Sequence, residues 1–250
     1  MTADAAELKP LQLSIATWNI HKGFSLFNRR MVVHELRERL HSLAADIVFL
    51  QEVQGLHLRH ASRHPDWPAE PQHRFLAAGV WENHSYGRNQ VYDHGHHGNA
   101  ILSRFPILHE HNQDVTHLRF ERRGLLHCTV ELPTPHRHST LHCVCVHLSL
   151  LGFSRQRQIG ELLARLEDIV PPQAPLLIAG DFNDWSNRAH KLLAERMGLI
   201  EAFAQQQQRP MRSFPAAYPM LRLDRIYQRG MIALHAQRHA GPPWSAISDH

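Results

Sequence analysis

Short apolar runs rich in β-forming residues recur along the chain and predict a series of strands. Residues 126–132 alternate between apolar and polar side chains, which is typical of a strand with one buried face. Residues 140–146 are apolar on both faces apart from His142, as expected for a central strand. The predicted strands are residues 11–20, 46–50, 98–103, 126–132, 140–146, 176–179 and 223–227.

Apolar positions with helical spacing lie between these strands. Residues 30–43 and 155–170 each place their leucines, isoleucines and valines on one stripe, and two prolines end the second segment. A shorter helix is predicted at residues 188–197, just before Gly198. These stripes predict core contacts and not cofactor or partner surfaces.

The order of the elements indicates a layered fold. Strands outnumber helices and are grouped with hairpin-like connections, which favours an α+β class over an alternating barrel. Two stacked sheets with helices outside fit this pattern. The sequence has no internal repeat and no Gly/Ser linker, so we expect an N-terminal tail over residues 1–10 and a single domain over residues 11–250.

Composition and charge narrow the class of protein. The apolar fraction of 43% and the charged fraction of 20% are ordinary for a folded protein. The formal net charge is +4, and nearly all the cations are arginines. This excess suits an anionic partner such as nucleic acid or an anionic lipid surface, and it is equally what an arginine-rich proteome would produce.

Cysteines and terminal segments bear on the compartment. Cys128, Cys143 and Cys145 form no CxxC pair, so we expect reduced, buried thiols. The first ten residues are acidic and lack the pattern of a signal peptide, and no apolar run reaches the ~20 residues that span a bilayer. A cytoplasmic protein without a transmembrane segment is expected.

Polar side chains capable of metal and phosphate chemistry follow several apolar runs. Asn19, Glu52, His147 and Asp181 each stand at or just past the end of a predicted strand, and Ser248-Asp249-His250 closes the sequence. Each residue alone has an ordinary structural explanation, such as a turn cap or a satisfied core histidine. Together they are the groups that a hard divalent cation and a phosphodiester require. The pattern predicts a metal-dependent phosphoesterase.

A resemblance to a known family rests on these segments and covers nearly the whole chain. The segments TWN, LQE, GNAILSR, VHLSL, AGDFN, RLDRIY and SDH occur in the order of the endonuclease/exonuclease/phosphatase superfamily, which the chain resembles. That group includes pancreatic-type deoxyribonucleases, apurinic/apyrimidinic endonucleases, sphingomyelinases and inositol-polyphosphate phosphatases. The resemblance implies a four-layer α/β/β/α sandwich with two mainly antiparallel or mixed sheets. It also implies Mg²⁺ or Mn²⁺ as the cofactor.

The same resemblance implies a role for each matching residue. Glu52 is expected as the principal metal ligand, with Asn19 and Asp249 close to it. Asp181 is expected to orient or deprotonate the attacking water, and Asn183 to hold a phosphate oxygen. His250, oriented by Asp224, is expected to stabilise charge on the phosphorane. His147 stands where deoxyribonucleases and sphingomyelinases carry a histidine and apurinic endonucleases a tyrosine. Members of the superfamily normally continue past SDH with a proline and an apolar strand, whereas His250 is the last residue here.

Other conspicuous residues lack a decisive pattern. The run His94-Gly95-His96-His97 has no accompanying zinc-ligand spacing, so an exposed loop is expected there. Trp185 and Arg188 are expected either to contact substrate or to pack at a helix entry. Phe24, Phe27, Arg29 and Arg30, which follow TWN, are expected to contact a base or lipid or to anchor the next helix.

The expected function is hydrolysis of a phosphodiester, first of all in DNA or another nucleic acid, by a monomer. The alternatives are a phospholipase, sphingomyelinase-like or inositol-phosphate phosphatase activity, and a catalytically silent scaffold. Exposed apolar loops around the cleft would favour a lipid substrate. An arginine-lined groove would favour a polynucleotide.

Overall fold

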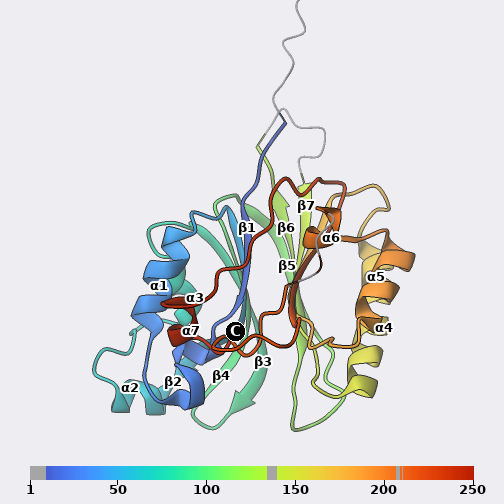
Figure 1. Ribbon diagram of the computed structural model, residues 1–250. Coiled ribbons are helices and arrows are strands. Elements are labelled where there is room, and N and C mark those ends of the chain that lie inside the picture. The colour runs from blue at the N-terminus through green and yellow to red at the C-terminus, as the bar shows by residue number, and fades with distance from the viewer. Residues whose placement is uncertain (1–9, 134–139, 207–208, 210) are drawn as a thin grey trace, which may run out of the picture.

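Two β-sheets stacked face to face form the centre of the molecule, and helices cover both outer surfaces (Figure 1). The computed structural model describes residues 10–133, 140–206, 209 and 211–250. The arrangement confirms the α+β class and the four-layer α/β/β/α sandwich with mixed sheets. The predicted tail lies outside the described residues except for Pro10.

The first sheet has four strands. Their order is β1 (Ile15–Asn19), β2 (Ile47–His57), β4 (Gly95–Ser103) and β3 (Asn83–Tyr92). β1 and β2 are parallel and are connected through α1 (Val33–Ser42), whereas the other pairs are antiparallel. The remaining helical segments of this half are η1 (His21–Gly23), η2 (Leu26–Asn28), α2 (Leu58–Arg63), α3 (Gln72–Ala77) and α7 (Trp244–Ile247).

The second sheet has six strands. Their order is β5 (Ile107–Asp114), β6 (Gly124–Glu131), β7 (Thr140–His147), β8 (Leu176–Asp181), β10 (Asp224–Arg229) and β9 (Ile200–Glu201). β7 and β8 are parallel and are connected through α4 (Gly152–Ile169), whereas the other pairs are antiparallel. The other helices of this half are α5 (Arg188–Met197) and α6 (Ala202–Gln205).

Three apolar clusters hold the layers together. One lies between the sheets and combines side chains of the first sheet, such as Phe49 and Ile101, with side chains of the second, such as Cys143 and Ala179. A second joins α1, α3 and Ile247 to the outer face of the first sheet. The third joins α4 and α5 to the outer face of the second sheet. Burial of these faces is the main favourable term for the fold.

The strands missed by the sequence patterns are β3, β5 and the two-residue β9, and all three are edge strands. An edge strand exposes much of its surface, so its sequence need not be apolar. β5 is exposed along most of its length, and its polar segment ILHEHNQD shows no apolar run. The buried interior strands, by contrast, were all predicted, and the helix at residues 188–197 coincides with α5.

Two sequence expectations are wrong in detail. Residues 94–97 are not an exposed loop: His96 and His97 lie within β4, where they pair with β3 and β2, and only His94 is in the turn. Glu52 does not follow the end of its strand either, because β2 continues to His57. The part of β2 beyond Leu50 contains Gln51 and Gln54, which are polar although they are buried. The apolar run therefore stopped at Leu50, and the sequence pattern predicted too short a strand.

The three cysteines are buried and unpaired, as expected. Among the described residues, no helix combines the length and the apolar character that crossing a membrane requires.

Candidate active site at one end of the two sheets

Three neighbouring strands of the second sheet bring candidate residues side by side. His147 ends β7 and is in register with Asp181, which ends β8, and Asp181 is in register with Asp224, which begins β10. Paired residues of adjacent strands lie on the same face. Cys145 and Ala179, two residues earlier on β7 and β8, belong to the cluster between the sheets. The period of two therefore directs these polar side chains to the end of the same inter-sheet space.

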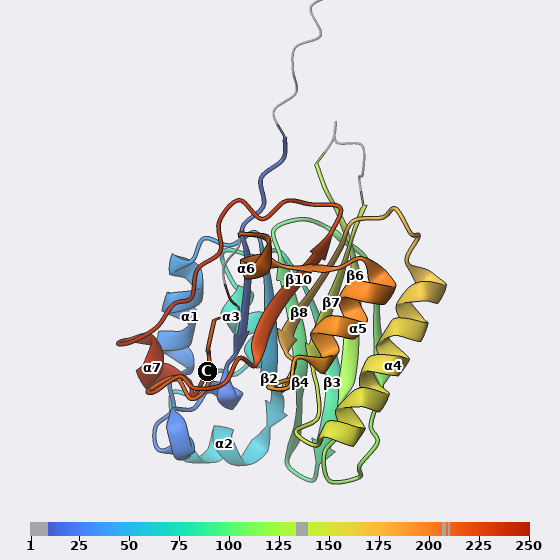
Figure 2. The same cartoon turned by 45° about the vertical axis from the view of Figure 1, so that its right-hand side comes forward.

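The first sheet and the C-terminal segment complete the group. Asn19 is the last residue of β1 and is almost fully buried. Ser248 Oγ donates a hydrogen bond of 2.7 Å to the Asn19 carbonyl and accepts one of 3.1 Å from the His250 amide. Trp244 of α7 packs against Trp18, with ring centroids 5.2 Å apart. The last residues of the chain are thus held against the first sheet, and the chain ends close to α7 (Figure 2). His250 reaches Asp224 of the second sheet.

Asp181 is the meeting point of these side chains. Its Oδ2 accepts a hydrogen bond of 3.3 Å from Asn19 Nδ2. The same oxygen lies 3.5 Å from His147 Nε2 and 3.7 Å from His250 Nε2. Its Oδ1 accepts a hydrogen bond of 3.0 Å from the Asn183 amide. One carboxylate therefore connects both sheets, the β8–α5 loop and the C-terminal segment.

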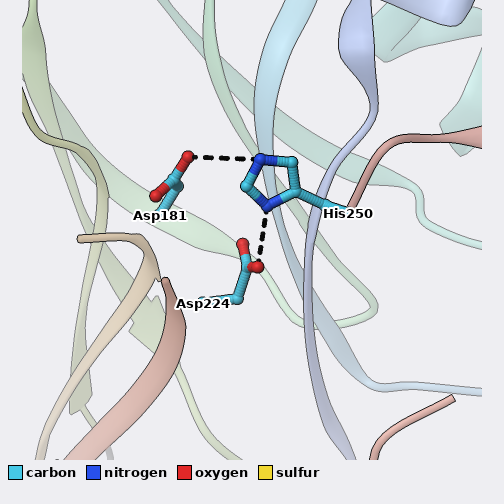
Figure 3. Close-up of side chains that lie close together, drawn as sticks. All are labelled: Asp181, Asp224 and His250. Atoms are coloured by element: carbon cyan, nitrogen blue, oxygen red, sulfur yellow. Dashed lines mark hydrogen bonds and ion pairs between the residues drawn. The ribbon is translucent and has the colours of Figure 1, made fainter. Parts of the chain in front are cut away.

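His250 lies between two carboxylates, as Figure 3 shows. Its Nδ1 is 2.8 Å from Asp224 Oδ2, and its Nε2 faces Asp181. Burial alone would lower the pKa of this imidazole, but the Asp224 and Asp181 carboxylates overcome it and raise the pKa to about 10. His250 is therefore protonated at neutral pH and can donate from both ring nitrogens.

The other two ionisable groups of the centre are shifted by burial. The pKa of Asp181 is raised to about 6, mainly because the carboxyl is removed from water, although the nearby His250 acts in the opposite direction. Burial, and then the charge of Arg123, lowers the pKa of His147 well below its usual value. A neutral imidazole and a carboxylate that titrates near neutrality are suited to proton transfer.

Glu52 projects from a bulge in β2. Leu50 pairs with Ala100 and Val53 with Gly98, so Gln51 and Glu52 together oppose one residue of β4. Glu52 has a φ of 55°, in the left-handed region that non-glycine residues rarely adopt. Such strain is retained where surrounding structure imposes it and often marks functional positions. Because of the bulge, the Glu52 side chain does not follow the alternation of side chains between the two faces of β2.

The surroundings of Glu52 are cationic. Lys22 Nζ lies 2.9 Å from Glu52 Oε2. Burial would raise the pKa of Glu52, but the Lys22 ammonium outweighs it and holds the pKa well below the usual range. Glu52 is therefore ionised and already paired with a positive charge.

Asn19, Glu52 and Asp249 are the residues that the sequence predicts as ligands of a hard divalent cation. Asp249 Oδ1 is buried without a hydrogen-bond partner among the described residues, and Asp249 Oδ2 is 3.9 Å from His21 Nε2. The set offers two carboxylates and an amide oxygen, which is the donor chemistry that Mg²⁺ takes from proteins.

A second set of ligand atoms is close enough to share an ion. Atoms of Asp181, Asp224 and His250 lie within 4.8 Å of one another. However, a protonated imidazole cannot coordinate a metal, and His250 is held protonated by both carboxylates. In the protonation state described above, Asp181, His250 and Asp224 form an ion-paired network.

Asn183 is close to the centre but its side chain is already engaged. Its Nδ2 donates a hydrogen bond of 2.9 Å to the Leu148 carbonyl. The contact with a phosphate oxygen expected for this residue therefore requires that bond to be released or shared. The backbone amide of Asn183 instead fixes Asp181.

Two residues near the centre carried no prediction from the sequence, and a third, His97, was expected in an exposed loop. Lys22 contacts Glu52, whereas Arg123 and His97 influence the ionisation of His147. His97 pairs with Gln90 beside a bulge in β3. Arg123 lies on the β5–β6 loop, where its Nε donates to the Leu148 carbonyl at 3.4 Å. No local sequence pattern marks them, because long-range pairing places them here.

A family model and a protein of similar sequence both match this chain over nearly its whole length. The model of the endonuclease/exonuclease/phosphatase family matches residues 16–250. The protein YbhP of Escherichia coli strain K12 is 42% identical over 244 residues, which are 98% of this chain and 95% of YbhP.

Solved structures share the fold at lower identity. An endonuclease/exonuclease/phosphatase from Beutenbergia cavernae matches with a TM-score of 0.67 and 22% identity, over 86% of this chain and 64% of that one. TDP2 of D. rerio in complex with a single-strand DNA product has a TM-score of 0.60 at 21% identity, over 87% and 83% of the two chains. The mannosyl-6-phosphatase Bt3783 of Bacteroides thetaiotaomicron has a TM-score of 0.63 at 14% identity, over 87% and 85%.

Proposed function

The chain belongs to the endonuclease/exonuclease/phosphatase family, whose members are generally phosphoester hydrolases, and we propose that it hydrolyses phosphodiester bonds with the help of a divalent cation. The observation that carries the proposal is the convergence of Asn19, His147 and His250 on the single carboxylate of Asp181. A scaffold without catalytic activity has no need for this arrangement.

Asn19, Glu52 and Asp249 would hold the cation, with Mg²⁺ or Mn²⁺ the expected ion. When bound, such an ion supplies positive charge that polarises a phosphoryl oxygen and lowers the barrier to attack by water. The ionised state of Glu52 and the unpartnered Oδ1 of Asp249 support this assignment.

Asp181 and His250 would divide the proton transfers between them. Asp181, with a pKa of about 6, accepts a proton from the attacking water. The water oxygen would bond to phosphorus while the bond from phosphorus to the leaving oxygen breaks. The leaving oxygen would take a proton from His250, and the proton accepted by Asp181 would restore it, since His250 Nε2 faces that carboxylate. Protonated His250, held by Asp224, donates hydrogen bonds to the charge that develops on the phosphoryl oxygens. Neutral His147 keeps Asp181 oriented from the adjacent strand.

The substrate expected from the sequence is a nucleic acid, and that remains a prediction. Among structures with this fold, TDP2 is complexed with single-strand DNA, whereas Bt3783 is a mannosyl-6-phosphatase. The fold is therefore compatible with more than one phosphoester class.

Hydrolysis of the soluble diester bis(p-nitrophenyl) phosphate tests the proposal independently of any natural substrate. We expect release of p-nitrophenol with Mg²⁺ or Mn²⁺, none with EDTA, and a loss of about 10²-fold or more in Asp181→Asn and in His250→Asn. Asp168→Asn, an exposed change on α4, is the matched control and should keep full activity. Turnover that persists in EDTA, or in the Asp181 variant, would contradict the mechanism.

A further inference from the structure

Exposed apolar side chains surround the candidate active site on six separate loops or helix ends. We call these side chains the apolar rim, and they are Phe27, Leu58, Phe120, Leu150, Trp185 and Tyr218. Phe27, Phe120 and Tyr218 are 72%, 79% and 77% exposed, which is unusual for such large apolar groups. An exposed apolar patch beside a site marks an interaction surface.

Each rim residue is tied to the site by the chain segment that carries it. Phe27 lies in the segment after Asn19, Leu150 three residues after His147, and Trp185 four residues after Asp181. Leu58 begins α2, directly after the strand that carries Glu52. In Figures 1 and 2, α2 and the start of α4 lie at the same, lower end of the molecule.

The two remaining rim loops are tied to the site by contacts across the fold. Tyr218 belongs to a loop whose Phe214 ring lies 4.9 Å from the His250 ring and whose Ala216 amide donates to the Asp249 carbonyl at 2.7 Å. Phe120 belongs to the β5–β6 loop, whose Glu121 carboxylate accepts a hydrogen bond of 3.0 Å from the Leu150 amide. Glu121 thus joins the loop that carries Phe120 to the loop that carries Leu150.

Positive charge lies among the rim residues. The same segments carry exposed arginines that form no ion pair within the described part of the chain, namely Arg29, Arg59, Arg63, Arg119, Arg122 and Arg188. Arg29 sits 5.4 Å from the centre of the Phe27 ring, so charge and apolar surface are adjacent. Guanidinium groups next to exposed apolar side chains match an anionic lipid surface, where phosphates lie above hydrocarbon.

The aliphatic members of the rim favour a bilayer over a polynucleotide. Aromatic rings can stack on bases, but Leu58 and Leu150 can neither stack nor donate a hydrogen bond. Burial of these two leucine side chains in the apolar part of a bilayer would lower the free energy, because it removes apolar surface from water.

On the basis of the proposed function, we propose that this end of the molecule docks on an anionic phospholipid membrane and that the substrate is a phosphodiester of a lipid headgroup. The rim enters the interface, the arginines bind lipid phosphates, and the site centred on Asp181 faces the headgroup layer. Phosphodiester hydrolysis then occurs on a lipid that need not leave the bilayer.

Vesicle sedimentation with the full chain tests the docking surface without reference to turnover. We expect binding to vesicles of phosphatidylcholine mixed with phosphatidylglycerol and much weaker binding to phosphatidylcholine alone. The double variant Phe27→Ser/Phe120→Ser removes two phenylalanine side chains that enter the membrane interface on docking. It should weaken vesicle binding by about tenfold or more. The matched control is Ile232→Ser/Leu234→Ser, a change of two side chains that are 75% and 70% exposed on the loop after β10, at the opposite end. The control should bind like the unchanged protein.

Activity measurements separate this proposal from the proposed function. The Phe27/Phe120 variant should hydrolyse bis(p-nitrophenyl) phosphate normally but release headgroup from phosphatidylglycerol vesicles at least tenfold more slowly. Soluble glycerophosphoglycerol, which has the same headgroup linkage without acyl chains, should be cleaved equally by both proteins. If the unchanged protein does not hydrolyse bis(p-nitrophenyl) phosphate, the proposed function is refuted. The vesicle-binding measurement still tests the docking surface in that case.

Three results would overturn the lipid proposal. One is absence of binding to the anionic vesicles. Another is equal weakening by the rim variant and by the control at the opposite end. The third is binding of a single-stranded oligonucleotide that the rim variant abolishes while vesicle binding stays negligible, because that outcome would assign the rim to nucleic acid.

Discussion

Individual side chains at this site have ionisation states that their neighbours impose. His250 is protonated because two carboxylates flank it, and Asp181 titrates near neutrality because it is buried. Glu52 is ionised although it is buried, because the Lys22 ammonium lies close to it. A carboxyl that titrates near neutrality, a protonated imidazole and an ionised carboxylate therefore lie within one small region, as the proposed acid–base catalysis requires.

Lys22 competes with a divalent cation for Glu52 if Glu52 is a metal ligand. Removing the ammonium in Lys22→Met leaves the Glu52 carboxylate without its cationic partner at 2.9 Å. We expect Mg²⁺ affinity to rise by about threefold, a modest change because the ion pair is partly exposed. Isothermal titration with Mg²⁺ measures this without turnover.

The matched control for this change is Lys191→Met, whose ammonium pairs with Glu195 on the surface of α5. Unchanged or weaker Mg²⁺ binding by Lys22→Met would show that Glu52 does not hold the ion, or that Lys22 assists in holding it.

At the scale of elements, two backbone features present the carboxylates. The bulge of β2 turns Glu52 out of the strand's alternation. Gly180 has a φ of +143° directly before Asp181, and a Cβ added there would lie 2.0 Å from the Val146 carbonyl oxygen. The close approach of β8 to β7 therefore depends on a residue without a side chain. This approach sets His147 beside Asp181.

Gly180→Ala should consequently destabilise the protein and disturb the site. The added methyl group must push β8 away from β7, and we expect the free energy of unfolding to fall by more than about 2 kcal/mol. Urea denaturation followed by tryptophan fluorescence measures the change. Phosphodiester turnover should fall as well, because Asp181 moves with the backbone.

Gly160→Ala serves as the matched control, since a Cβ added at this position of α4 meets no atom within 4 Å. It should raise stability by about 0.5 kcal/mol, because alanine is the better helix former. If both variants lost stability equally, the role assigned to the β7–β8 approach would be wrong.

At the scale of the whole molecule, the candidate site exists only because both sheets and the C-terminal segment meet. Asn19 comes from the first sheet, Asp181 and Asp224 from the second, and Ser248 links the C-terminal segment to β1. His250 then spans to Asp224. The protonation of His250 is therefore coupled to folding of the entire chain.

The free energy of unfolding should depend on alkaline pH through this histidine. Its pKa rises from an ordinary 6.5 to about 10 in the folded protein. The stabilisation is complete below pH 6.5 and is lost as pH rises through 10, because the folded protein must then release the proton. Denaturation in urea and EDTA between pH 6.5 and 10 should show this loss.

Asp224→Asn removes the carboxylate nearest to His250 and should flatten the pH dependence over that range. Measurements stay above pH 6.5 because Asp181, whose pKa is raised to about 6, contributes a separate dependence at lower pH. Identical pH dependence in both proteins would show that Asp224 does not hold His250 protonated.

The sequence alone determined the family and the layers, and it named candidate site residues whose roles stay predictions. Its apolar runs located the interior strands, since buried strands must be apolar on the faces that pack. The ordered segments from TWN to SDH indicated the family that the family match confirms.

Only the tertiary structure decided what no local pattern records. The edge strands β3 and β5 lack an apolar pattern because much of their surface is exposed. The continuation of β2 lacks one because its buried side chains include the amides of Gln51 and Gln54. Lys22 reaches Glu52, and the β5–β6 loop is joined to the loop after β7, through contacts between residues far apart in sequence. Charge state and surface exposure follow from such distant neighbours, so they required the folded chain.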